Sequence, residues 1–336
     1  MLDKNFKELF NIIKNDIYHT RYKVQSLANS ELIALYYRIG KYVYENAKYG
    51  NALVDNLSIN LKLEFPNTDG FSSRNILRMK KFYEEYKDLE ISPLPMAKLT
   101  WTHNNILISK VKDTKERLWY ARKAYENGWA CSVLETQIDT DLYTRQNTAE
   151  KLTNFDNKLP SSQSELARDT IKDPYIFELI GIKEDFIEAD IENAMVERIK
   201  NVLLELGKGF SFLGNQYKIS TDNNDYYIDL LFYHLDLRCY ITVELKNKEF
   251  KPEFMGQLSF YVTAIDETLK KDIDNPTIGL LLCRNKDKLS VEWALKSTNA
   301  PIGVSSFEIA KIIPKDILDR LPTEEDINLH IDIKED

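Results

Sequence analysis

Apolar side chains in the first half of the chain recur three and four residues apart, as on one face of an α-helix. The spacing predicts a helix that Ser30 caps and that runs to about Val43, and a second helix over residues 51–65. A breaker, Pro66 to Gly70, follows, and Ser72 or Ser73 then caps a third helix that ends near Tyr86. Further helices are expected over about 101–110, 114–127 and 132–143. The first half is therefore predicted to be all-helical.

The pattern changes in the second half, where runs of β-branched and aromatic residues appear. Residues 154–173 are polar with few apolar anchors and predict a linker, so we place the domains at 1–164 and 165–336. After this linker the expected elements are a helix (184–207), three strands (210–220, 226–234, 238–245), a helix (252–270), a strand (277–283), a helical stretch (291–296) and a last strand (302–307). This α-βββ-α-β order predicts an α/β domain whose middle helix crosses over between strands of one sheet.

Composition narrows the class of protein. The chain has 336 residues, of which 43% are hydrophobic and 29% charged, as in soluble globular proteins of two domains. It has neither an apolar run of about 18 residues nor an export leader, so we expect no membrane segment. Its three cysteines are far apart, which favours a cytoplasmic protein without a disulfide framework or a zinc site. No small-molecule cofactor is expected.

Charge is distributed unevenly along the chain. The formal net charge is −8, yet residues 71–123 hold 12 Lys and Arg against 6 Asp and Glu, a local balance of +6. Two helices, a tight turn and a basic third helix resemble a helix-turn-helix. The residues expected to meet DNA stand near the start of that third helix: Arg74, Arg78, Lys80 and Lys81. The alternative is a solvated basic face on an ordinary helical bundle.

The strongest candidate chemistry lies on the second and third predicted strands. From Arg238 to Lys246 apolar and polar residues alternate, which puts Glu244 and Lys246 on the same face. The preceding strand is apolar or aromatic apart from one carboxylate, Asp229. A buried carboxylate costs several kcal/mol unless it is paired, hydrogen-bonded or bound to a metal. Asp229 is therefore a candidate metal ligand.

A hairpin between these strands would bring the two acids together. If it turns around Asp236 and Leu237, residues whose numbers sum to 473 face each other, as Asp229 and Glu244 do. Opposed carboxylates about 5 Å apart are poor for stability but are good ligands for a hard cation such as Mg²⁺ or Mn²⁺. With a backbone carbonyl near Leu245, they would hold the ion, and Lys246 would stabilise the attacking hydroxide and the transition state of phosphodiester hydrolysis.

The C-terminal half resembles the YhcG-type family of PD-(D/E)xK nucleases. The stretches that carry this resemblance are Leu203–Phe210, Tyr227–His234, Val243–Lys246, Gly256–Tyr261 and Ile278–Cys283. Two N-terminal stretches, Gly70–Asn75 and Leu99–His103, are similar to the family's helical, winged-helix-like DNA-binding region. The resemblance thus covers nearly the whole chain.

This resemblance implies a restriction-endonuclease-like core and Mg²⁺-dependent DNA cleavage, with Asp229, Glu244 and Lys246 at the motif positions. It also implies a helix glutamate among the metal ligands, which we assign to Glu192, with Glu188 as the competitor. By the same analogy Gln257 on the crossover helix lines the site. The family's proline before the first aspartate is absent, since Ile228 stands there.

We therefore expect a metal-dependent endonuclease that acts on DNA. Two alternatives remain from the sequence: a DNA-binding or scaffolding protein whose nuclease fold does not cut, and an enzyme that cleaves RNA. A homo-oligomer is expected by analogy, because nucleases that cut both strands usually need two active sites.

Overall fold

The computed structural model describes residues 4–46, 50–89, 95–179 and 187–310. The chain divides into two compact units, an N-terminal unit (residues 1–143) and a C-terminal unit (residues 144–336). None of the helices in these described ranges is both long and apolar enough to cross a membrane.

The N-terminal unit is helical, as predicted. Its described elements are α1 (Lys4–Glu45), α2 (Gly50–Glu64), α3 (Ser73–Tyr86), the short 3₁₀-helix η2 (Pro95–Lys98), α4 (Trp101–Lys110), α5 (Thr114–Asn127) and α6 (Cys131–Asp139). Ser72 caps α3, because its hydroxyl accepts a hydrogen bond from the Asn75 N–H. The described residues of this unit contain no strand, so they provide no wing, and the helix-turn-helix assignment stays a prediction.

The predicted start of a helix at Ser30 is wrong, because α1 runs without a break from Lys4 to Glu45. A serine at a helix interior costs only a fraction of a kcal/mol, so the cap-like residue does not interrupt the helix. The buried side chains of α1 begin at Ile33 and end at Val43, and they pack on α2, α3 and η2. At Gly40 the backbones of α1 and α3 approach so closely that a Cβ would lie 2.0 Å from the carbonyl oxygen of Met79. The side chains described before Asn29 are exposed.

The C-terminal unit is built on one mixed sheet. Its elements are the one-turn π-helix η3 (Thr144–Thr148), β1 (Leu152–Thr153), α7 (Phe155–Lys158), α8 (Ser161–Thr170), β2 (Tyr175–Glu178), α9 (Glu188–Glu197), α10 (Ile199–Leu206), β3 (Phe210–Ser220), β4 (Asp225–His234), β5 (Cys239–Glu249), α11 (Phe254–Thr268), β6 (Ile278–Asn285), α12 (Lys288–Ser297) and β7 (Ile302–Ala310). The sheet order is β1-β7-β6-β5-β4-β3, and β2 pairs with a further part of β7. Strands β3, β4 and β5 are antiparallel, whereas β5, β6 and β7 are parallel through the crossover helices α11 and α12.

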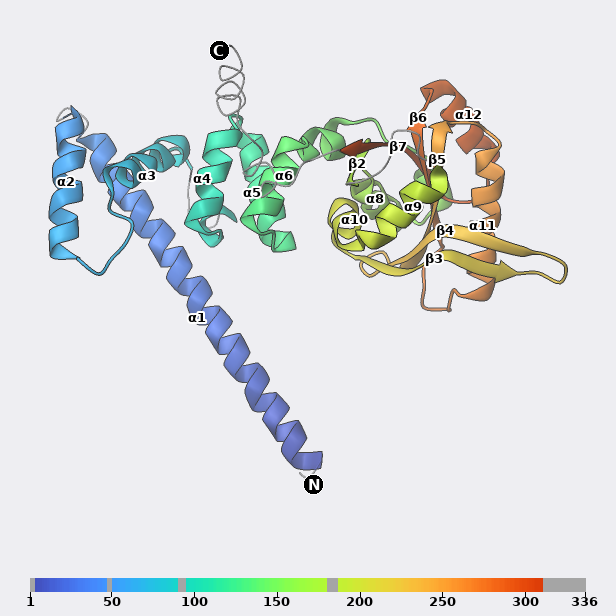
Figure 1. Cartoon of the computed structure of the whole chain (residues 1–336), viewed down its shortest axis with the longest axis horizontal. Coiled ribbons are helices and arrows are strands. Elements are labelled where there is room, and N and C mark those ends of the chain that lie inside the picture. The colour runs from blue at the N-terminus through green and yellow to red at the C-terminus, as the bar shows by residue number, and fades with distance from the viewer. Residues whose placement is uncertain (1–3, 47–49, 90–94, 180–186, 311–336) are drawn as a thin grey trace, which may run out of the picture. The chain divides into compact units, whose positions relative to one another are not determined.

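Helices cover both faces of this sheet (Figure 1). On one face α8, α9 and α10 bury the alternate apolar residues of β5, including Ile241 and Val243. On the other face α11 and α12 pack over β6 and β7 through residues such as Leu258 and Leu295. The three layers confirm the predicted α/β core, in which most of β5 and β6 is buried on both faces.

Three local predictions for this unit are wrong. Residues 154–173 are no linker, because α7 and α8 bury Phe155 and Ala167 in the core. The helix expected over 184–207 is two helices that meet at Arg198, and its first residues lie outside the described ones. The sequence predicts Glu205 as an exposed helix residue, but its side chain is 6% exposed and pairs with Arg145 at 2.5 Å. The boundary at residue 164 stays a prediction, whereas the compact units divide after Tyr143.

Candidate active site

The two strands that carry the predicted motif pair in the predicted register. The Cα partners run from His234 opposite Cys239 to Leu230 opposite Val243, and every pair has the expected sum of residue numbers. Asp229 and Glu244 follow directly after the last pair. Regular pairing thus delivers both acids to the same end of the β4–β5 ladder, at its junction with α9 and α11.

Asp229 is held in place by the backbone of the neighbouring strand. Its Oδ2 accepts a hydrogen bond of 2.8 Å from the Leu245 N–H, and its Oδ1 lies 3.4 Å from Nε2 of Gln216 on β3. Burial raises the pKa of this carboxyl to about 6 against the opposing effects of the Leu245 N–H and the Lys246 ammonium. The carboxylate is held in one position by hydrogen bonds, but the nearby donors and the Lys246 charge do not fully offset the cost of burying its negative charge.

Glu244 is the most buried acid of the group, at 1% exposure. Its Oε1 accepts a 2.7 Å hydrogen bond from Lys246, while its Oε2 is buried without a hydrogen-bond partner in the described part of the chain. Burial and then the charge of Asp229 raise its pKa to about 7. A buried oxygen without a partner is costly, and a catalytic or ion-binding role is one explanation for such a group.

Lys246 lies between two carboxylates. Its Nζ is 2.7 Å from Glu244 Oε1 and 3.6 Å from Glu188 Oε2. Burial lowers the pKa of this ammonium, but the hydrogen bond and charge of Glu244 outweigh it, so the pKa is raised. Lys246 therefore keeps its proton near neutral pH and provides a positive charge and hydrogen-bond donors.

Both candidate glutamates of α9 reach this region, by different contacts. Glu192 is buried, and its oxygens accept hydrogen bonds from Asn215 at 3.1 Å and from Gln216 at 2.6 Å. Its charge acts on Asp229 and helps to raise the pKa of that carboxyl. Glu188 contacts Lys246 and accepts a 3.1 Å hydrogen bond from the Asn247 N–H. The geometry therefore keeps Glu192 beside Asp229 and puts Glu188 beside the lysine.

Gln257 lies one step away from the acids. Its Nε2 donates a 3.0 Å hydrogen bond to the hydroxyl of Tyr261, one turn further along α11. Burial raises the pKa of Tyr261, and the charges of Glu244 and Asp229 raise it further, so this hydroxyl is within electrostatic reach of the pair. Gln257 thus borders the site through Tyr261.

Sequence reasoning missed two contributors, Gln216 and Tyr261. Gln216 adopts a φ of 44°, and the printed sequence contains no glycine or turn residue at this position that signals it. The only trace is a polar pair, Asn215 and Gln216, inside a strand that is otherwise rich in aromatic residues. Tyr261 follows Gln257 by one helical turn, a spacing that places the two side chains on one face.

No group of three His, Cys, Asp or Glu side chains converges closely enough to hold an ion within the described ranges. The reason is visible in the contacts, because Lys246 occupies one oxygen of Glu244 and two amides occupy Glu192. Among these acids, Glu244 has an oxygen without a partner in the described residues, and Asp229 has one oxygen held only by the 3.4 Å contact of Gln216.

The four predicted DNA-contacting residues do not share one face of α3. Arg74, Arg78 and Lys81 are exposed and follow each other at helical spacing, whereas Lys80 is half-buried on a different side. Lys81 pairs with Glu85 at 2.6 Å. Arg74 and Arg78 form no ion pair with any described residue, which leaves both guanidinium groups facing solvent.

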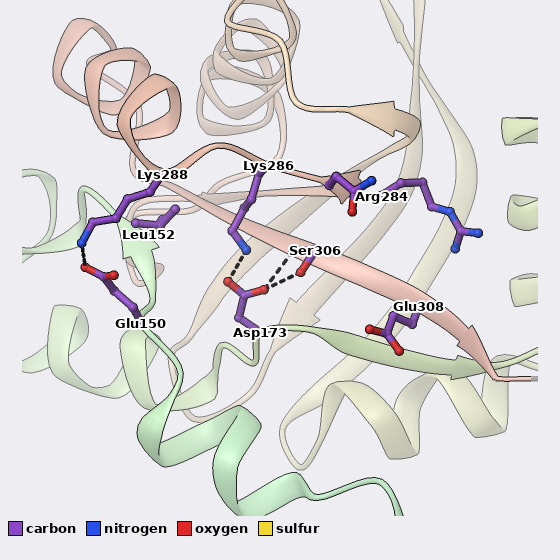
Figure 2. Close-up of a pocket in the computed structure, with 9 residues that line it drawn as sticks. Glu150, Leu152, Asp173, Arg284, Lys286, Lys288, Ser306 and Glu308 are labelled. Carbon is purple, nitrogen blue, oxygen red and sulfur yellow. Dashed lines mark hydrogen bonds and ion pairs between the residues drawn. The ribbon is translucent and has the colours of Figure 1, made fainter.

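A separate pocket of about 370 Å³ lies between the end of β6, β7 and the segment before β2. Figure 2 shows Lys286 and Ser306 directed toward Asp173. Ser306 donates to Asp173 through both its N–H and its hydroxyl, at 3.1 and 2.7 Å, and Lys288 pairs with Glu150 at 2.5 Å. The pocket contains none of the predicted site residues, and its ion pairs join neighbouring segments of the fold.

Comparison with known proteins agrees with this geometry. Residues 168–322 match the family described as the YhcG PDDEXK nuclease domain, and residues 12–145 match the DUF1016 N-terminal domain. The protein YhcG of Escherichia coli (strain K12) is 29% identical to this chain over 329 residues, with 87% of each chain covered.

Two solved structures align with part of this chain at low identity. The crystal structure of a repair endonuclease from Pyrococcus abyssi aligns with a TM-score of 0.26 and 14% identity over 39% of this chain and 50% of that one. The structure of an EndoMS complex with double-stranded DNA aligns with a TM-score of 0.27 and 17% identity over 39% and 49%. The chain thus spans about half the length of these solved structures. The C-terminal half of the chain thus matches the YhcG PDDEXK nuclease domain and the N-terminal half matches the DUF1016 N-terminal domain, which confirms the predicted resemblance to the YhcG-type nucleases.

Proposed function

We propose that this chain is a metal-dependent endonuclease that hydrolyses phosphodiester bonds of DNA. The observation that carries the proposal is the pair formed by Asp229 and Glu244, two carboxylates of raised pKa beside Lys246, one of them with an oxygen that no described group satisfies. The nuclease-domain match supports nuclease activity, and this pair supports the place where it occurs.

The residues present fit a divalent cation. Asp229 Oδ1 and Glu244 Oε2 are hard oxygen donors of the kind that Mg²⁺ and Mn²⁺ prefer, and the like charges that destabilise each other would be neutralised. Glu192 is the third acidic candidate, and the Leu245 carbonyl is expected to complete the protein's donor set. When bound, the cation makes an attacking water more acidic and offsets charge on the phosphate.

Lys246 supports the same reaction from its own side. Because it stays protonated, it cannot act as a base at neutral pH. Its ammonium instead binds a non-bridging phosphate oxygen and stabilises the extra negative charge of the transition state. Glu188 and Glu244 fix its position before substrate arrives.

The other predicted site residues have positioning roles in this proposal. Glu192, through Gln216, fixes the carboxylate of Asp229. Gln257 orients the Tyr261 hydroxyl toward the carboxylate pair. Neighbours of this kind typically change metal affinity or rate by about 10- to 100-fold when they are removed.

DNA as the substrate is supported by the N-terminal unit. Arg74, Arg78 and Lys81 form an exposed basic stripe on α3. Arg74 and Arg78 can bind phosphates without first giving up an ion pair to a described residue, whereas Lys81 would exchange its pair with Glu85. The overall charge of −8 does not oppose this, because attraction of a polyanion depends on the local field.

A cleavage assay with the whole chain tests the proposal. Plasmid, linear duplex, single-stranded and branched DNA, and RNA of matching sequence, are incubated with Mg²⁺ or Mn²⁺, with EDTA as the chelated control. We expect cutting of DNA by the wild type and a loss of at least about 100-fold in Asp229→Ala and in Lys246→Ala.

The matched control is Lys248→Ala, which removes an exposed lysine two residues further along β5. It should cut as well as the wild type. Equal cutting by Lys246→Ala and wild type would overturn the proposed site, and cutting of RNA alone would replace the substrate. Tight DNA binding with no cutting under any condition would instead favour a binding protein.

A further inference from the structure

The N-terminal part of α1 projects from the rest of its unit (Figure 1), and no side chain described before Asn29 is buried by another described residue of the chain. Its large apolar residues are exposed, among them Phe10 at 56%, Ile17 at 48% and Val24 at 60%. An isolated helix of this length is marginal in water, because helices in proteins draw most of their stability from packing an apolar face. A helix with this much exposed apolar surface therefore requires a partner.

The spacing of these residues indicates that the partner is another α-helix. Side chains alternate three and four residues apart along one stripe: Phe10, Ile13, Ile17, Thr20, Val24 and Leu27. This is the a and d pattern of a left-handed coiled coil, whose period of 3.5 residues differs from the wider face of a helix packed on a globular core. β-branched residues at a, here Ile17 and Val24, with Leu27 at d, favour two strands.

The charges beside the stripe select a parallel pair of identical helices. Position g holds Asp16 and the following e position holds Arg21. In a parallel dimer each g residue faces the e residue of the next heptad in the other helix, so Asp16 would meet Arg21 of the second copy twice. In an antiparallel dimer e faces e and g faces g, so the repulsion between Lys14 and Arg21 would cancel the attraction between Asp16 and Lys23.

We propose that residues 9–28 of α1 form a parallel two-stranded coiled coil with a second copy of this chain, which makes the protein a homodimer. The stripe of Phe10, Ile17, Val24 and Leu27 would be the buried seam, and the pairs of Asp16 with Arg21 would fix its direction. The dimer would bring two nuclease units into one particle. Dimerisation through α1 does not depend on the cleavage chemistry, and it is measured by the mass of the particle and not by its activity.

Light scattering after size exclusion, and sedimentation over a range of concentrations, test the proposal on the full chain. We expect twice the chain mass of 39.3 kDa. Ile17→Lys should shift the protein to monomer, whereas the matched control Ile12→Lys should not, although Ile12 is equally apolar and more exposed at 66%. Both positions lie outside the buried core, so neither change unfolds the unit.

Charge reversal tests the direction of the helices. Arg21→Glu would place two acids opposite each other and should weaken a parallel dimer by roughly tenfold, and Asp16→Arg combined with Arg21→Glu should restore it. A dimer strengthened by Arg21→Glu alone would overturn the parallel arrangement. A wild type that is monomeric at all concentrations, or one that Ile12→Lys dissociates as strongly as Ile17→Lys, would overturn the coiled coil.

Discussion

The backbone N–H of Leu245 donates a 2.8 Å hydrogen bond to Oδ2 of Asp229, and it does so where the regular pairing of β4 with β5 has ended. The bond replaces the next rung of the ladder with a contact from backbone to carboxylate. It fixes the direction of the aspartate, whose other oxygen, Oδ1, lies 3.4 Å from Nε2 of Gln216. One oxygen of Asp229, Oδ2, is therefore held by the backbone, and the other, Oδ1, is the oxygen that we propose as a metal ligand.

Removing the charge of Asp229 should stabilise the protein in the absence of divalent metal. Asp229→Asn keeps an oxygen for the Leu245 N–H but removes a buried charge whose folded pKa is about 6 against an ordinary value of 3.8. We expect a gain on the order of 2 kcal/mol at pH 8, measured by thermal unfolding in EDTA.

The sign of the pH dependence follows from the raised pKa. The folded state binds this proton more tightly than the unfolded state does, so the wild type is relatively most stable below about pH 4 and loses stability as the pH rises through about 6. The difference in the free energy of unfolding between Asp229→Asn and the wild type should therefore be absent near pH 4 and should increase as the pH rises from about 4 to about 6. Asp225→Asn, an exposed carboxylate on the same strand, should show no such gain.

Gln216 should matter for activity more than its exposure suggests. Gln216→Ala removes the amide that contacts both Glu192 and Asp229, so we expect the cleavage rate at limiting Mg²⁺ to fall by about 10- to 100-fold. Titration of the rate with Mg²⁺ measures the effect, which saturating metal should partly reverse. Asn223→Ala, an exposed amide in the turn of the same hairpin, serves as the control. Identical titration curves for Gln216→Ala and wild type would contradict the bridging role.

The buried pair of Glu205 and Arg145 should dominate the stability of the C-terminal unit. Glu205 also accepts a 2.9 Å hydrogen bond from the Ile176 N–H and pairs with Lys172 at 3.7 Å. Glu205→Ala would leave two buried cations without their carboxylate, at a cost of about 3–5 kcal/mol. Urea denaturation measures it, and Glu197→Ala, an exposed glutamate on α9, should change stability by less than about 0.5 kcal/mol.

The basic stripe of α3 should contribute to DNA affinity without discriminating sequence. In an Asp229→Ala background, which should not cut, Arg74→Ala with Arg78→Ala should weaken duplex binding and reduce the slope of log affinity against log salt by about 2. Fluorescence anisotropy at several salt concentrations measures both. Lys80→Ala, on a different side of the same helix, should leave the slope unchanged, and an equal loss there would contradict a directed stripe.

The sequence predicted those features that depend on local periodicity. Alternation along β5 and a single acid in an apolar β4 were enough to give the register that brings Asp229 beside Glu244. Residues 154–173 were misjudged because a few apolar side chains, such as Phe155 and Ile171, are enough to cover a sheet that needs burial. The sheet face that these residues cover forms only when strands distant in the sequence have assembled. The local pattern of residues 154–173 therefore cannot predict their burial.

In the candidate site, too, local periodicity predicted some residues, and others depend on the tertiary structure. Glu244 and Lys246 were assigned from a period of two, which backbone geometry enforces. The assignment of Glu192 over Glu188 stays a prediction, because both stand on α9 one turn apart and each reaches the site through a different partner. Gln216 was missed because its contacts depend on a positive φ within β3, a tertiary property of that strand.

The unbroken course of α1 gives its length a meaning that a flexible connection lacks. Its C-terminal half is held against α3 at Gly40, and its N-terminal half carries the exposed apolar stripe. Because a helix turns about 100° for each residue, one residue inserted after Leu27 would rotate the stripe by that angle relative to the arginines of α3. Seven inserted residues would return it to within about 20°. The effect of an insertion in this segment therefore depends on the rotation that it causes and not on the number of residues added. In a flexible connection, the rotation would have no effect.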